Sequence, residues 1–248
     1  MSSNTRPDPA APAGSGILAA QAIEALTRAG AIRSASPYAA DQIQPASLDL
    51  RLGARAFRVR TSFLPGAGRS VSTCIEAFSF HEIDLRAGAV LETGCVYIAE
   101  LQEALTLPAD LAAGANPKSS TGRIDVFTRV ITDHAVAFDQ VEAGYTGPLY
   151  AEISPRTFPV LVRTGSRLSQ IRFRRGEVRL RDAELAELHA RTPLVSAASP
   201  SFQGGVAVSV DLAGFDGLIG YRAKRHTGLR RVGHRDPANA LRTRSAGF

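Results

Sequence analysis

Three short segments with the composition of β-strands lie close together in "GYTGPLYAEISPRTFPVLVRTGSRLSQIRF", residues 144–173. They are "PLYAEIS", "PVLVRTG" and "SQIRF", and Gly, Pro and Ser residues separate them. β-Branched or aromatic content and two-residue alternation are typical of strands of about five to seven residues. This stretch therefore predicts β-structure with tight connections.

The same pattern continues toward the N-terminus, in "SLDLRLG", "RAFRVR", "EIDLRAG", "CVYIAEL" and "DVFTRVI". Many short strands at this spacing predict a closed or double-sheet antiparallel fold, of the jelly-roll or barrel type. Two segments predict helices instead. Residues 17–32 place Glu24 and Arg28 opposite an apolar face, and residues 181–191 form a second amphipathic segment in which we interpret His189 as a helix-end residue.

The composition indicates a globular protein, because 44% hydrophobic residues in a chain of 248 suffice for a core. No run of about 18 apolar residues and no signal-peptide core is found, so we expect neither a membrane partner nor secretion, and a cytoplasmic location. Cys74 and Cys95 are 21 residues apart, outside any C-x-x-C motif, and are expected to be free thiols.

The net charge of +6 is concentrated at the C-terminal end. Residues 222–248 contain eight Lys and Arg residues and one acid, whereas the rest of the chain carries 21 basic and 22 acidic residues. A nearly neutral body does not predict a nucleic-acid groove across the fold, so no nucleic-acid partner is expected.

Three regions follow from the composition along the chain. Residues 1–15 are rich in Pro, Ala, Ser and Gly and are expected to be disordered. Residues 16–204 contain the predicted strands and both predicted helices and are expected to form the main domain. Residues 205–248 are expected to hold the start of an incomplete second module and a basic tail, since "SVDLAGFDGLIGYRAKR" weakly repeats "SLDLRLGARAFRVR". The Arg-rich end after about residue 228 is interpreted as a disordered tail, a truncation or a change of reading frame.

Anion-binding groups are concentrated in "GANPKSSTGRIDVFTRVI", residues 114–131. A Pro followed by Ser and Thr residues favours a short helix, whose first N–H groups have no partner within the helix. Lys118, Ser119, Ser120 and Arg123 would add cationic groups and hydroxyls to a phosphate site. An ordinary polar turn is the alternative, and the segment does not match the Walker A pattern.

Glu152 lies in the middle of the predicted strand "LYAEIS", on the face opposite an apolar row. A lone Glu at such a position is commonly solvated. If this face lines a cavity, a carboxylate partly removed from water becomes a candidate general base.

Four motifs in order carry a resemblance to a known family. "PASLDLRLG", "TLPADLAAGANPKSSTGRIDV", "GYTGPLYAEIS" and "GSRLSQIRF" resemble the dCTP deaminase family and, more distantly, the trimeric dUTPases, over residues 16–176. The resemblance implies a mainly β fold with a few short helices, a dUTPase-like distorted jelly-roll or β-clip barrel. It also implies a homotrimer with active sites between subunits, and the internal repeat resembles a tandem form of these deaminases.

The resemblance implies conversion of dCTP to dUTP and ammonia, with Mg²⁺ accompanying the triphosphate and dTTP as an inhibitor. The family's Arg-Ser-Ser segment falls on Lys118, Ser119 and Ser120, the following Arg on Arg123, and the catalytic Glu on Glu152. Lys118 keeps the charge of the usual Arg but lacks its bidentate fork.

Other family positions lie on both sides of these motifs. Asp49 matches a position that supports the site, and Gln170 is a candidate nucleotide contact. The family's Gly-aromatic-x-Gly turn falls on residues 144–147, with Tyr145 as its aromatic residue. The Asp that precedes this turn in the family is replaced by Glu142, with Asp139 as another candidate.

The expected chemistry is hydrolytic deamination without zinc, because the H-x-E and P-C-x-x-C signatures of zinc deaminases are absent and the five His residues are dispersed. By the resemblance, Glu152 takes a proton from water and returns it to N3 and the leaving amine. Ser119 and Arg123 orient the water and hold Glu152, while Lys118 and Ser120 hold phosphate.

Two alternatives stay open. A dUTPase, or a bifunctional deaminase and diphosphatase, would use Asp139 or Glu142 to activate water against phosphorus. A non-catalytic chain would only bind nucleotide or assemble with other subunits.

Overall fold

The computed structural model describes residues 14–220 and 230–231. Residues 1–13 of the segment expected to be disordered, and most of the basic tail, therefore lie outside the described residues. The helices are α1 (Ala20–Arg28), α2 (Val71–Phe78), α3 (Ser119–Arg123) and α4 (Asp182–Arg191). The strands are β1 (Gly16–Ile17), β2 (Ile32–Ser34), β3 (Ile43–Gln44), β4 (Ser47–Val59), β5 (Ser79–Asp84), β6 (Ala89–Leu91), β7 (Val96–Thr106), β8 (Leu111–Pro117), β9 (Val126–Thr132), β10 (Gln140–Val141), β11 (Thr146–Pro155), β12 (Val160–Val162), β13 (Arg167–Arg175) and β14 (Arg230–Arg231).

The chain divides into two compact units. Of the described residues, 14–176 and 230–231 belong to the first unit, and 177–220 belong to the second. The expected boundary at residue 204 stays a prediction.

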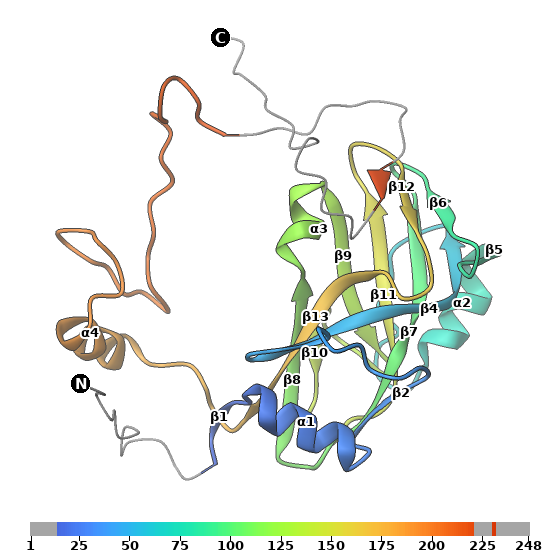
Figure 1. Cartoon of the computed structure of the whole chain (residues 1–248), viewed down its shortest axis with the longest axis horizontal. Coiled ribbons are helices and arrows are strands. Elements are labelled where there is room, and N and C mark those ends of the chain that lie inside the picture. The colour runs from blue at the N-terminus through green and yellow to red at the C-terminus, as the bar shows by residue number, and fades with distance from the viewer. Residues whose placement is uncertain (1–13, 221–229, 232–248) are drawn as a thin grey trace. The chain divides into compact units, whose positions relative to one another are not determined.

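The first unit is built on a sheet with the strand order β10-β8-β13-β4-β7-β11-β9. β1 pairs with β13, β2 with β7, and both β3 and β5 with β4, while a smaller sheet has the order β14-β12-β6. In Figure 1, α1 lies at one end of this sheet structure and α3 at the other, beside β9. The mainly β fold with a few short helices is confirmed.

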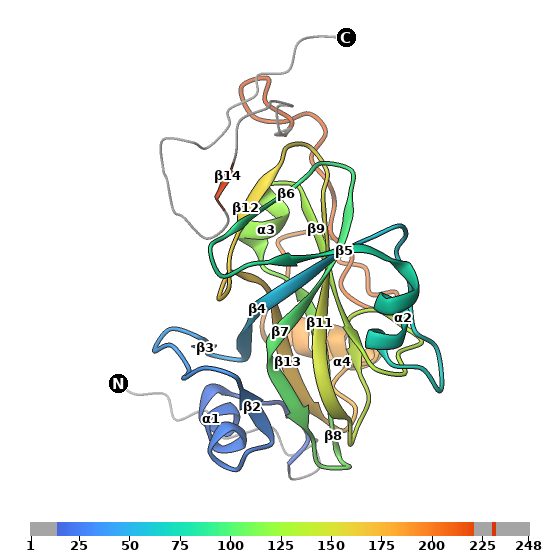
Figure 2. The same cartoon turned by 90° about the vertical axis from the view of Figure 1, so that its right-hand side faces the viewer.

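Strand β4 connects the two halves of the sheet (Figure 2). Its first residues pair with β13, and its later residues pair with β5 and β7. The sequence suggested two separate strands here, because Gly53 resembles a break. In the structure β4 continues through Gly53. Glycine is needed there for another reason: a Cβ at this position would lie 3.0 Å from the carbonyl oxygen of Glu100, and a strand glycine often marks such a close approach.

The sheet is nearly closed into a barrel, and Asp139 bridges the gap by hydrogen bonding to β9 and to β8. Its N–H donates to the Val130 carbonyl on β9 at 2.9 Å, and its carbonyl accepts from Ala115 N–H on β8 at 2.8 Å. Its side-chain Oδ1 also accepts from Val130 N–H at 2.7 Å. Asp139 has φ 62°, a left-handed conformation that Asp tolerates better than most residues. Asp139 therefore has a structural role.

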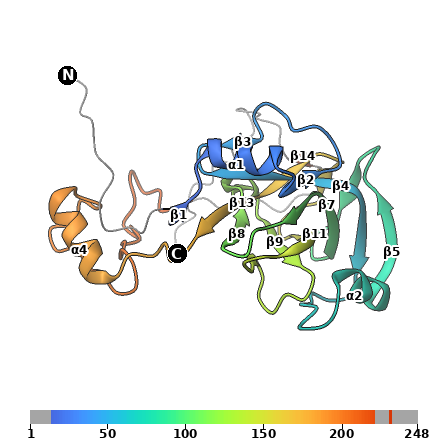
Figure 3. The same ribbon diagram turned by 90° about the horizontal axis from the view of Figure 1, so that it is seen from below.

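Two of the clusters formed by buried apolar residues in the described part of the chain show how the sheet packs. One cluster contains Ile23 from α1 together with Leu48, Leu50 and Phe173. The other contains Ile98, Ile131 and Tyr150 from the sheet and packs them against Val71, Cys74 and Ile75 of α2. Figure 3 shows α2 beside β5 on the outside of the sheet. The sequence reading did not identify α2, a short helix that Ser70 caps by accepting from Thr73 N–H at 3.2 Å.

The described part of the second unit, residues 177–220, contains α4. The predicted helix is confirmed, and no residue of α4 is buried. His189 near its end accepts a hydrogen bond at Nδ1 from Leu194 N–H at 3.0 Å, which agrees with its interpretation as a helix-end residue. Val208, Val210, Leu212 and Phe215 are exposed.

Candidate functional site

Several predicted phosphate-binding residues line one cavity. The α3 cavity, as we call it, has a volume of about 380 Å³ and is lined by Gln44, Pro45, Ala46, Ser47, Asp49, Lys118, Ser119, Gln170 and Arg172. Ser120 and Arg123 lie on the same short helix and are exposed. The structure therefore brings Lys118, Ser119 and Gln170 together.

Helix α3 is held against β13 by two hydrogen bonds to one carbonyl. Lys118 N–H and Thr121 Oγ1 each donate to Leu168 O at 2.9 Å. The short helix expected after Pro117 is thus confirmed. No side chain of the described residues caps its start, and uncapped N–H groups at a helix start are suited to an anion.

A buried carboxylate lies behind the α3 cavity. Asp49 is 1% exposed, and its Oδ2 accepts from Lys118 Nζ and lies 3.5 Å from Arg167 Nη1. Its other oxygen, Oδ1, is buried without a hydrogen-bond partner among the described residues. Asp49 therefore positions Lys118 at the cavity and offsets part of its charge.

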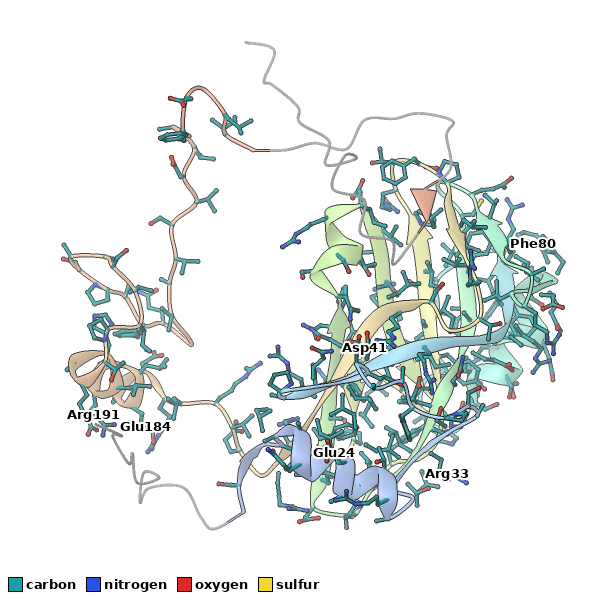
Figure 4. The ribbon with its side chains drawn as sticks, in the orientation of Figure 1. Glu24, Arg33, Asp41, Phe80, Glu184 and Arg191 are labelled. Atoms are coloured by element: carbon teal, nitrogen blue, oxygen red, sulfur yellow. The ribbon has the colours of Figure 1, made fainter. Side chains whose placement is uncertain are left out.

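Arg167 links the buried Asp49 carboxylate to Asp41 on the surface of the barrel. Its Nη2 donates to Asp41 Oδ1 at 2.8 Å, and this hydrogen bond lowers the pKa of Asp41. Asp41 is labelled in Figure 4. The carboxylates of Asp41 and Asp49 together hold Arg167 beside the cavity.

Glu152 lies in the centre of β11 and is buried rather than solvated, with 2% exposure. Its Oε1 accepts from Arg129 Nε at 3.2 Å and from Arg129 Nη2 at 2.5 Å. Its Oε2 is buried and has no hydrogen-bond partner among the described residues. The arrangement provides a desolvated carboxylate with one oxygen available to accept a proton.

The described residues of one chain do not bring all predicted site residues together. Glu152 does not line the α3 cavity, and its hydrogen bonds go to Arg129 rather than to Ser119 or Arg123. The expectation that Ser119 and Arg123 hold Glu152 stays a prediction, as does a site completed between subunits.

Tyr145 and Glu142 line a second cavity. This cavity has a volume of about 150 Å³ and is lined by Thr132, Asp133, His134, Ala135, Val136, Ala137, Gln140, Glu142 and Tyr145. Tyr145 Oη donates to Pro148 O at 2.7 Å and accepts from Asp133 N–H at 3.1 Å. Burial raises the pKa of Tyr145, so the phenol stays protonated. Burial also raises the pKa of Tyr150, on the Glu152 side of β11, to about 12.

Gly147 leaves the space in which the Tyr145 ring lies. A Cβ at Gly147 would lie 2.5 Å from Tyr145 Oη. We expect Gly147→Ala to displace the phenol from both hydrogen bonds and to lower the free energy of unfolding by ~1–3 kcal/mol, measured by urea denaturation.

The matched control is Gly122→Ala, because a Cβ there would meet no atom within 4 Å. We expect this control to change stability by less than ~1 kcal/mol. Equal stability of the two variants would contradict the role assigned to the Tyr145 hydrogen bonds.

Asp139 and Glu142 are the two candidate acids ahead of the turn at residues 144–147. Burial raises the pKa of Asp139, and the hydrogen bond from Val130 opposes that shift. Its backbone and Oδ1 are engaged in closing the barrel, whereas Glu142 is exposed at the second cavity. Of the two acids, Glu142 is better placed to reach a ligand.

Sequence reasoning missed Arg129. The antiparallel register of β9 and β11 places Arg129 directly opposite Glu152. Pairing the two predicted strands would have suggested this contact, but the loop between them left the register undetermined.

No group of three or more His, Cys, Asp or Glu side chains within residues 14–220 is arranged to hold a metal ion. The expectations of Mg²⁺ with the triphosphate and of zinc independence stay predictions. Over the same residues, none of the helices has the length and apolar character needed to span a membrane.

Comparison with family models gives two adjacent matches. Residues 14–177 match the 2'-deoxycytidine 5'-triphosphate deaminase (DCD) N-terminal domain. Residues 181–242 match the 2'-deoxycytidine 5'-triphosphate deaminase (DCD), C-terminal domain.

Individual proteins agree with these matches. The chain is 32% identical over 159 residues to a "dCTP deaminase, dUMP-forming" of Parafrankia sp., covering 62% of this chain and 74% of the relative. It is 34% identical over 142 residues to a "dCTP deaminase" of Natronomonas pharaonis, covering 53% of this chain and 66% of the relative. The crystal structure of 2'-deoxycytidine 5'-triphosphate deaminase from Agrobacterium tumefaciens is similar to 88% of this chain, with TM-score 0.82 and 57% identity. The match spans 65% of the length of that chain.

Proposed function

The chain belongs to the 2'-deoxycytidine 5'-triphosphate deaminase family, and from this premise we propose that it hydrolyses dCTP to dUTP and ammonia. Water adds to C4 of the cytosine ring, N3 takes a proton, and the C4–N bond breaks to release ammonia. The oxygen of water becomes the O4 of uracil. The reaction needs a base near C4 and groups that hold the triphosphate.

The buried carboxylate of Glu152 is the observation that carries this proposal. One of its oxygens is fixed by Arg129, and the other is buried without a partner among the described residues. A carboxylate in this state can accept a proton from water and return it to N3 and the leaving amine. Glu152 is therefore the proposed general base.

The α3 cavity supports the placement of the triphosphate. Lys118 and Ser119 line it, and the exposed hydroxyl of Ser120 lies on the same helix. We assign phosphate binding to Lys118 and Ser120, and orientation of the water to Ser119 and Arg123. Gln170, which also lines the cavity and accepts from Ser47 Oγ at 3.2 Å, is assigned as a nucleotide contact.

Mg²⁺ would supply charge neutralisation at the triphosphate when it is bound. The described residues offer no carboxylate cluster for a resident ion, so the proposal makes Mg²⁺ part of the substrate complex. The proposal further includes a homotrimer with sites between subunits, inhibition by dTTP, a cytoplasmic location and chemistry without zinc.

Product analysis tests the proposal. Incubation with dCTP and Mg²⁺ is expected to release ammonia and dUTP in equal amounts, measured by an ammonia assay and by chromatography of the nucleotides. Binding of dCTP in a calorimeter with no release of ammonia would instead support a non-catalytic chain.

A second candidate follows from the names of some relatives. The Parafrankia relative is a "dCTP deaminase, dUMP-forming", and Glu142 is an exposed acid at the second cavity. A bifunctional enzyme would release dUMP and diphosphate with the ammonia, whereas a dUTPase would act on added dUTP and release no ammonia from dCTP. The same product analysis separates these cases.

A further inference from the structure

Arg129 hydrogen-bonds to the proposed general base, Glu152. Arg129 on β9 and Glu152 on β11 are directly opposed in antiparallel register, so their side chains leave neighbouring strands on the same face. Arg129 Nε and Nη2 both donate to Glu152 Oε1, at 3.2 Å and 2.5 Å. The side chains of Arg129 and Glu152 are 25% and 2% exposed.

Arg129 is itself fixed by other contacts. Its Cζ lies 3.4 Å from the ring centroid of Phe138 and 4.9 Å from that of Phe127. Its Nη2 also donates to Ser62 Oγ at 2.9 Å. A guanidinium stacked on aromatic rings and bonded in its plane has few orientations left. Arg129 is therefore a rigid support for the carboxylate.

Both contacts fall on the same carboxylate oxygen. Because Oε1 takes two donors and Oε2 takes none from the described residues, the two oxygens of Glu152 are not equivalent. Resting on the function proposed above, we infer that Arg129 is a positioning residue that reserves Oε2 for the proton of the attacking water. A structural ion pair that only offsets the burial of Glu152 is the competing explanation.

Four variants of the full chain separate these explanations: Arg129→Met, Arg129→Lys, Arg129→Ala and Arg58→Met. We expect Arg129→Met to lower kcat for ammonia release by about 100-fold, since small displacements of a reacting group have effects of that size. The dissociation constant for dCTP should change by less than about threefold, because the contact acts on the base rather than on the nucleotide. Arg129→Lys, which keeps one donor, should recover part of kcat, and guanidinium ion should partly restore Arg129→Ala.

Arg58→Met is the matched control. Arg58 is also a strand arginine, stacked 5.9 Å from the Phe80 ring centroid and 3.9 Å from the Glu92 carboxylate. Neither contact involves a residue of the proposed machinery, so kcat should stay at the wild-type value. An additional cycle compares Glu152→Gln with and without Arg129→Met. If Arg129 acts through the Glu152 carboxylate, its loss should cost no further activity in that background.

The outcomes distinguish this inference from the proposed function. A folded Arg129→Met variant with wild-type kcat would overturn the positioning role while leaving the deaminase proposal standing. If adding Arg129→Met to Glu152→Gln lowers kcat by the same factor as in the wild-type chain, the positioning role is overturned as well. If Arg129→Met does not fold, lack of rescue in both Arg129→Lys and guanidinium-treated Arg129→Ala overturns it. A wild-type chain that releases no ammonia from dCTP overturns the proposed function itself.

Discussion

Glu152→Gln is expected to lower ammonia release from dCTP by about 10³-fold or more, near the upper range for removal of a general base. Gln keeps the shape of Glu and an oxygen that can accept from Arg129, but it cannot take a proton from water at neutral pH. The dissociation constant for dCTP, measured by calorimetry, should stay close to the wild-type value.

Glu82→Gln is the matched control for this variant. It makes the same chemical change on β5, where the side chain of Glu82 is 51% exposed. Its turnover should equal that of the wild-type chain. If Glu152→Gln retains wild-type turnover, another group must activate the water.

Glu103→Met is expected to have the largest effect on stability. Glu103 is completely buried, and its Oε1 accepts from Gln42 Nε2 at 2.8 Å and from Arg51 Nε at 2.9 Å. Its Oε2 accepts from Arg51 N–H at 2.8 Å. Removal of the carboxylate leaves the buried guanidinium without its counter-charge, which costs ~3–5 kcal/mol in comparable pairs.

The measurement is thermal and urea unfolding of Glu103→Met beside Glu82→Met. A loss of that size corresponds to a Tm decrease of roughly 6–20 °C for a chain of this length. Glu82 forms an exposed ion pair with Arg55 at 3.6 Å, so its removal should cost at most ~1 kcal/mol. If both variants unfold at the same temperature, the buried pair does not support the barrel as described.

The strands were predictable because their side chains follow a local two-residue pattern. Helix α2 was not, since its β-branched Val71 and Thr73 disfavour a helix, and packing of Val71 and Ile75 against the sheet stabilises it. Gly53 was misread as a break because only the fold shows that β7 approaches it closely.

The site was predictable to the extent that its motifs are contiguous in sequence. Lys118 and Ser119 could be grouped because they are adjacent, and they do line one cavity. The pairing of Arg129 with Glu152 depends on the register of two strands, and the pairing of Lys118 with Asp49 depends on the packing of α3 at the end of the sheet. Neither contact follows from residue order alone.

The path of the water oxygen tests the central claim most directly. The reaction is run with dCTP and Mg²⁺ in H₂¹⁸O, and the base and phosphate fragments of the product are separated by mass spectrometry. Deamination predicts one ¹⁸O atom in the uracil base, with ammonia released in equal amount. Product without ¹⁸O in the base, or label only in phosphate, would contradict attack of water at C4.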